Sequence, residues 1–190
     1  RDLQDATKST TIEGQRLLDV NELKGYAAFT SDDGYLSLLS FPGLELVKRL
    51  PDRLLGTCCG RFSGSGRYFT AGSTQNTSQL WDLSDVKEIS QPIRRVHPCP
   101  VRDIAFSADG RFIIIVLTNA NLEVSDVASG AVLMIDHPNL GQAWSIGVAA
   151  NNRTIAIGYE NGDIRIHDWA DVSSVRRSTI QSGTPFQAIA

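Results

Sequence analysis

Three arginines occupy equivalent places in this chain, each after a short polar turn and before an apolar run: Arg67, Arg111 and Arg153. If these turns lie on one face of the fold, the three guanidinium groups form an arc that could bind phosphate groups or an acidic partner. The alternative is that arginine is simply common in turns of this kind, and we favour this alternative. Arg102 is a fourth candidate for contact with a partner, although solvated charge is the usual role of such a residue.

Other residues that often do chemistry are arranged in ways that favour structural roles. His97 and His137 each precede a proline and lie 40 residues apart, which indicates a repeated hydrogen-bonding position. A metal site would need three or four converging ligands. The segment Gly64-Ser65-Gly66 is followed by a strand-like run, whereas a phosphate-binding loop opens into a helix. No Gly-x-Ser-x-Gly elbow is present. We therefore expect no enzyme, with no catalytic residue, metal, cofactor or small-molecule substrate.

The elements that position these residues recur along the chain. An aspartate closes the same pattern at Asp82, Asp126 and Asp168, which are 44 and 42 residues apart. Such a period, with several strands in each unit, is typical of a propeller blade, and Trp81-Asp82 is the dipeptide that names WD repeats. The sequence thus predicts an all-β fold, a WD-repeat β-propeller with about four four-stranded blades. Because WD-repeat rings usually have about seven blades, we expect the chain to be part of a seven-bladed ring.

The third unit shows its strands most clearly, and we expect them at 101–106, 112–118, 122–126 and 131–135. The apolar run from Ile113 to Leu117 is too short to cross a membrane, which takes about twenty residues. A continuous run of this length with β-branched residues favours a strand that is buried on both faces, between neighbouring blades.

The same pattern divides the chain into units. We expect a polar tail or loop at 1–14, followed by one propeller portion at 15–190. In the first unit, 21–26 leaves almost no room for a turn, which leaves open whether residues are missing there. The blades are expected at about 15–52, 53–96, 97–138 and 139–176, with a partial blade or ring closure at 177–190.

The charge and cysteine content of the sequence indicate which kinds of partner and which compartment to expect. The formal net charge is −3 and the pI is about 5.6, so electrostatic capture of nucleic acid by the whole surface is not expected. The three cysteines, Cys58, Cys59 and Cys99, have no Cys-x-x-Cys spacing, which indicates a reducing, intracellular compartment. The sequence carries no signal peptide, transmembrane span or lipidation motif, and we expect no membrane contact.

With the units aligned, the sequence resembles one WD-repeat family, subunit 3 of the THO complex. The similarity rests on the order of the blades from about 19 to 169, including which blade carries Trp81-Asp82. The first blade is shortened, and the apolar run at 113–117 replaces the small and polar residues usual in a second strand. The end of the chain, 176–190, has no counterpart in the family. The stretches that carry the resemblance are 33–47, 66–73, 80–83, 100–111 and 122–130.

The resemblance implies a non-catalytic scaffold in a nuclear complex that couples transcription to messenger RNA packaging and export. The expected partners are the other THO subunits, with a DEAD-box RNA helicase and an export adaptor reached through the complex. RNA contact would then be mostly indirect. Two alternatives stay open. One is a WD-repeat adaptor in chromatin, ubiquitin ligation or a vesicle coat. The other is a propeller that binds RNA directly through the arginine arc, with an affinity that falls steeply with salt.

Overall fold

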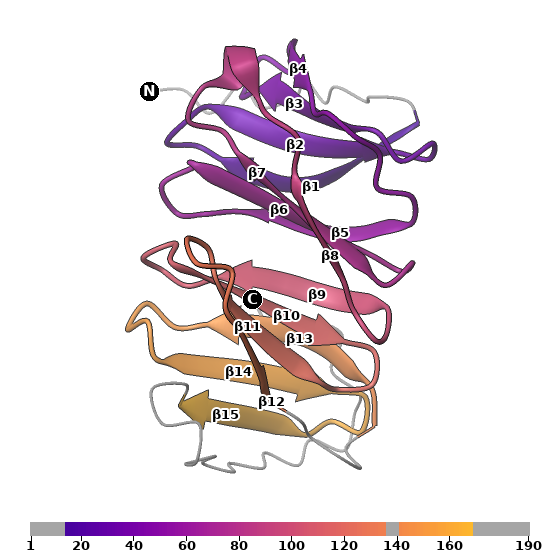
Figure 1. Cartoon of the computed structure of the whole chain (residues 1–190), viewed down its shortest axis with the longest axis vertical. Coiled ribbons are helices and arrows are strands. Elements are labelled where there is room, and N and C mark those ends of the chain that lie inside the picture. The colour runs from indigo at the N-terminus through magenta and orange to yellow at the C-terminus, as the bar shows by residue number, and fades with distance from the viewer. Residues whose placement is uncertain (1–13, 136–140, 169–190) are drawn as a thin grey trace, which may run out of the picture.

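The computed structural model describes residues 14–135 and 141–168, and their strands form four antiparallel sheets in succession along the chain (Figure 1). Within each sheet the strands are hydrogen-bonded in chain order. The first sheet contains β1 Gln15–Asn21, β2 Tyr26–Ser31, β3 Leu36–Ser40 and β4 Leu46–Arg49. The second contains β5 Thr57–Phe62, β6 Tyr68–Ser73, β7 Thr77–Asp82 and β8 Ile93–Val96, with the short 3-10 helix η1 Val86–Glu88 before β8. The third contains β9 Val101–Phe106, β10 Phe112–Leu117, β11 Leu122–Asp126 and β12 Val132–Ile135, and the fourth contains β13 Ala143–Val148, β14 Thr154–Tyr159 and β15 Ile164–Asp168.

The predicted strands of the third unit are confirmed within one residue at each end. The first three sheets have four strands, and the fourth has three within the part of the chain that the structure describes. The predicted closing segment at 177–190 and the predicted tail, except Gly14, lie outside the described residues, as does His137. None of the described segments is a helix long and apolar enough to span a membrane.

Strand β10 is apolar throughout because its two faces enter two different cores. Ile114 and Val116 pack against Ile155 and Ile157 of the fourth sheet. Ile115 and the other side chains on the opposite face of the strand pack with residues of the second sheet such as Leu80. A strand sandwiched in this way needs no polar face, which explains the unbroken run in the sequence.

The first strands of the four sheets, β1, β5, β9 and β13, lie side by side and form an inner wall. Carboxylates join neighbouring strands of this wall. The backbone N–H of Phe62 donates to Asp19 Oδ2 at 2.7 Å, and the N–H of Ile146 donates to Asp103 Oδ2 at 3.1 Å. These bonds use backbone groups at a sheet edge that no strand pairs, so they fix each blade to the next.

The short link at 21–26 is a complete turn. The backbone N–H of Gly25 donates to Glu22 O at 3.2 Å, and the N–H of Lys24 donates to Asn21 Oδ1 at 2.9 Å. Gly25 has φ of +66°, a conformation that glycine adopts without strain. The turn therefore closes the β1–β2 hairpin, and no further residues are needed between Asn21 and Tyr26.

Candidate functional site

Each of the three equivalent arginines forms an ion pair with the aspartate that ends the third strand of its own blade. The N···O distances are 3.1 Å for Arg67–Asp82, 2.9 Å for Arg111–Asp126 and 2.7 Å for Arg153–Asp168. The second and third strands are paired so that each aspartate lies opposite the residue after its arginine. The periodic arginine and the periodic aspartate are thus two halves of one feature that closes the end of a hairpin.

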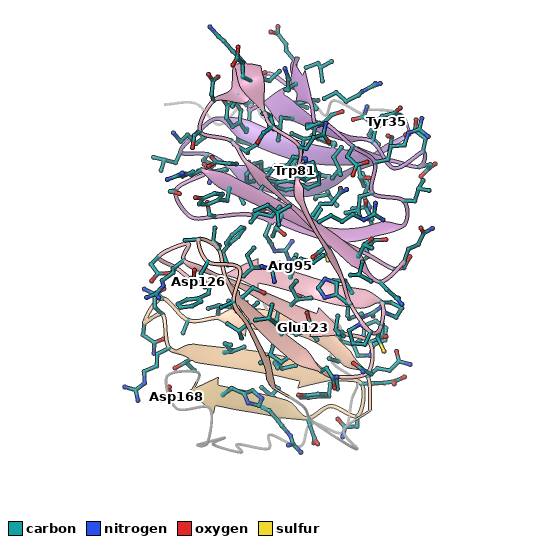
Figure 2. All side chains as sticks on the ribbon, viewed as in Figure 1. Tyr35, Trp81, Arg95, Glu123, Asp126 and Asp168 are labelled. Atoms are coloured by element: carbon teal, nitrogen blue, oxygen red, sulfur yellow. The ribbon has the colours of Figure 1, made fainter. Side chains whose placement is uncertain are left out.

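The turns that carry Arg111 and Arg153 touch, because the backbone N–H of Asp109 donates to Asn152 Oδ1 at 2.8 Å. The arc of all three arginines stays a prediction. Asp126 and Asp168 lie on the same side of the molecule (Figure 2). Each arginine side chain is more than half exposed, and its charge is compensated by the paired aspartate. The contacts favour the interpretation in which the arginines serve the turns, and a solvent-exposed pair of this kind contributes little to stability.

Asp126 gives this feature a measurable dependence on pH. The Ser129 backbone N–H, the Arg111 guanidinium and the Ser129 hydroxyl together lower the pKa of Asp126 from 3.8 to about 2. Because the pKa is lower in the folded chain, the stabilising contribution is present above about pH 4 and is lost as the pH falls through about 2. We expect Asp126→Asn to reduce the fall in melting temperature between about pH 5 and about pH 2, followed by circular dichroism. An equal fall in the two proteins would contradict this expectation.

A buried polar triad joins the second and third sheets. Ser78 Oγ is 2.9 Å from His97 Nε2, and His97 Nδ1 is 2.7 Å from Glu123 Oε2. Ser78 comes from β7, Glu123 from β11, and His97 from the link between the two blades. Figure 2 shows Glu123 on the third sheet. The structural role expected for His97 is therefore supported by its two hydrogen bonds, with a glutamate as the acidic partner.

Serine, histidine and glutamate, hydrogen-bonded in this series, also form the catalytic triad of some hydrolases. The sequence patterns did not indicate that these three residues come together. The exposed fractions argue against that use here, because Ser78 is 3 %, His97 is 4 % and Glu123 is 5 % exposed. A serine nucleophile must be reached by a substrate carbonyl, and this hydroxyl lies inside the contact between two blades. The chemistry available to this triad is hydrogen bonding across the interface between blades.

The inner wall carries a hollow of about 490 Å³ near the N-terminal ends of its strands, which we call the mouth. Arg16, Arg61 and Arg102 line it together with a single carboxylate, Asp103. The Cζ atom of Arg102 lies 3.8 Å from the ring centre of Trp144, which is about a third exposed. Arg102 thus lies near the start of a first strand, whereas the other three predicted arginines come after the far ends of the first strands.

The charges at the mouth are held in place by neighbouring groups. Arg61 Nη1 donates to Gly60 O at 3.0 Å, and its Nη2 lies 3.8 Å from Asp103 Oδ1. Arg16 donates to the carbonyl of Thr57. Burial raises the pKa of Asp103, while hydrogen bonds from the N–H groups of Ile104 and Ile146 oppose that shift. Three cations against one partly buried carboxylate leave the mouth positive in a chain that is acidic overall.

Two thiols also line the mouth. Cys58 Sγ and Cys59 Sγ are 3.5 Å apart. Hydrogen bonding between them lowers the pKa of Cys58, with burial acting in the opposite direction, and the same contact together with burial raises the pKa of Cys59. No group of three or more His, Cys, Asp or Glu side chains that could hold a metal ion is found among residues 14–135 and 141–168.

Comparison with known structures defines the class of protein. The chain matches the β-propeller domain of Cps50 (Swd1) from Myceliophteria thermophila with a TM-score of 0.75, over 92 % of this chain and 60 % of that one, at 14 % identity. At this identity the likeness shows the fold alone, and together with the four sheets it establishes a WD-repeat β-propeller fold, as the sequence predicted.

Comparison of sequences adds a more particular similarity. The chain is 29 % identical over 101 residues to THO complex subunit 3 of Arabidopsis thaliana. The match covers 53 % of this chain and 31 % of that protein, so the chain spans about a third of the length of this relative. No protein-family model matches the sequence.

Proposed function

We propose that this chain is a non-catalytic scaffold in a nuclear THO-type complex that couples transcription to the packaging and export of messenger RNA. The observation that carries the proposal is the 29 % identity to THO complex subunit 3 on a propeller fold. Its partners are the other subunits of the complex, and through them a DEAD-box RNA helicase and an export adaptor. RNA is contacted mainly through the assembly, which suits the net charge of −3 and the compensated arginines Arg67, Arg111 and Arg153.

The mouth is the docking surface that suits this role best. It offers three arginines whose guanidinium groups are held by Thr57, Gly60 and Trp144 before any partner arrives. Preformed guanidinium groups bind carboxylates in paired hydrogen bonds and lose little freedom when they do so. An acidic segment of a partner subunit is the ligand that complements this charge.

Affinity purification tests the proposal directly. The tagged chain is recovered from nuclear extract of its source cells with and without RNase, and the bound proteins are identified by mass spectrometry. Recovery of large THO subunits that survives RNase is the expected result. Recovery of a different set of proteins would remove the THO assignment, and loss of all partners with RNase would favour direct binding of RNA.

A matched pair of charge reversals tests the docking surface. Arg102→Glu is expected to lower recovery of the partner subunits about tenfold, which corresponds to about 1.4 kcal/mol of binding free energy. Arg94→Glu makes the same change of charge on the exposed outer strand β8 and is expected to leave recovery unchanged. Equal losses in the two variants would mean that only the overall charge matters and that the mouth is not the docking surface.

A further inference from the structure

Cys58 and Cys59 are neighbours in a strand, yet their sulfurs face each other. Successive side chains of a regular strand point to opposite faces of the sheet. The pairing of β5 with β6 shifts register between Thr57 and Cys59, so Cys58 lies in a β-bulge. A bulge re-aims the side chain of the extra residue. This is why the two sulfurs come within 3.5 Å of each other without a covalent bond between them.

The surrounding structure fixes this arrangement. The Cys58 thiol lies 3.1 Å from the carbonyl oxygen of Val101 on the next blade and 3.4 Å from that of Gly72. A Cβ atom on Gly72 would lie 3.0 Å from Cys59 Sγ and 2.4 Å from Val101 Cγ1. A glycine at 72 is thus required for the sulfurs to sit where they do. Both cysteines line the mouth, where a ligand can reach them: Cys58 is partly exposed, and Cys59 lies behind it with 8 % exposure.

The separation of the sulfurs indicates what they could bind. A disulfide needs about 2.05 Å between sulfurs, so forming one would move them together by roughly 1.5 Å. One ion bonded to both sulfurs holds them about 3.8 Å apart for metal–sulfur bonds of about 2.3 Å at a tetrahedral angle, and a narrower angle brings them closer. The observed 3.5 Å fits chelation without such a movement.

We propose that Cys58 and Cys59 form a dithiol site for a soft thiophilic ion that needs only two protein sulfurs, of which trivalent arsenic is the type. A structural zinc ion would need four ligands, and no third ligand of the usual kinds is grouped with these cysteines within the described residues. With an organic arsenoxide, both As–O bonds of the As=O group are replaced by two As–S bonds. Both thiol protons leave with the oxygen as water, and no electrons are transferred.

Phenylarsine oxide is the probe for this site. The full chain, reduced and freed of thiol reagent, is titrated with it, and the remaining thiols are then alkylated and mapped by mass spectrometry. We expect one phenylarsenic group per chain, with Cys58 and Cys59 protected and Cys99 alkylated. We also expect release by a dithiol but not by an equal concentration of a monothiol. Protection of Cys99, or a phenylarsenic group that links two chains, would overturn the proposal.

Single substitutions separate chelation from simple thiol reactivity. Once the first As–S bond has formed, the second forms within the same molecule and is therefore favoured. Cys58→Ser and Cys59→Ser are each expected to weaken binding of the arsenical about a hundredfold. Cys99→Ser removes one thiol outside the pair and is the matched control, with unchanged affinity expected. Binding by either serine variant as tight as that of the unsubstituted chain would refute the site. Because Cys59 is buried, the mapping on the unsubstituted chain decides the matter if Cys59→Ser does not fold.

Discussion

Glu123→Ala is expected to destabilise the chain by about 3–5 kcal/mol, because it removes one partner of a buried, hydrogen-bonded pair and leaves the other without it. His97 Nδ1 lies 2.7 Å from Glu123 Oε2, and both side chains are almost fully buried. The pair also joins two blades, so its loss affects the contact between sheets as well as the local strand. The measurement is the free energy of unfolding in urea, followed by circular dichroism.

Two further variants show whether the pairing is the cause. Ser78→Ala removes only the hydroxyl on the other side of His97, and the expected cost is smaller, about 1–3 kcal/mol. Replacing His97 and Glu123 together by leucine leaves no polar group unsatisfied, and the double variant should be less destabilised than Glu123→Ala alone. His97→Leu and Glu123→Leu are also measured singly. If the double variant lost as much stability as these two single variants added together, the hydrogen-bonded pair would not be the source of the effect.

The repeat could be predicted from the sequence because each blade is built from local contacts. The register that places Asp126 opposite Phe112 is set within one hairpin, and its sequence signals are a turn, an arginine and an alternating strand. The double-sided burial of β10 was likewise visible as an unbroken apolar run, because a strand without a polar face has no reason to alternate. Local patterns therefore carried most of the fold.

The triad and the mouth were missed because they are assembled from different blades. Ser78, His97 and Glu123 come from two blades and the link between them, and no pattern within one unit links the three. The only signal was His97-Pro98, which indicated a structural histidine in a hydrogen-bond network but not which residues of the other blades would join it. At the mouth, Arg16, Arg61 and Arg102 come from three first strands and converge only when the blades stack. Contacts that form only when blades pack against one another give no signal in the sequence pattern of a single repeat.

The arginines show how equal sequence signals can hide unequal roles. Arg67, Arg111 and Arg153 repeat with the blade and are bound by the aspartates that repeat with them. Arg102 does not repeat, and its guanidinium lies against Trp144 on the inner wall. The position outside the period is the one that faces a hollow. In a repeat fold, periodic residues tend to maintain the unit, and departures from the period are where specific binding can arise.

Trp81→Ala is expected to lower the free energy of unfolding by about 3–5 kcal/mol, as much as Glu123→Ala. The substitution removes the largest fully buried side chain of the described residues and leaves a cavity in its place. Trp81 packs in the core between the first two sheets, with its ring centroid 5.9 Å from that of Phe69. Its Nε1–H donates to the carbonyl of Pro51 at 3.2 Å, which ties the third strand of one blade to the link from the blade before. Urea unfolding measures the loss.

Trp81→Phe separates the volume of this side chain from its hydrogen bond. Phenylalanine keeps most of the apolar contact with Phe69 but cannot donate to Pro51, and the lost hydrogen bond is worth about 0.5–1.5 kcal/mol. Burial therefore predicts that Trp81→Phe costs less than half as much as Trp81→Ala. Equal costs for the two variants would show instead that the bond to Pro51 dominates. The tryptophan of the WD dipeptide would then act here chiefly as a link between blades, and its place in the core would be secondary.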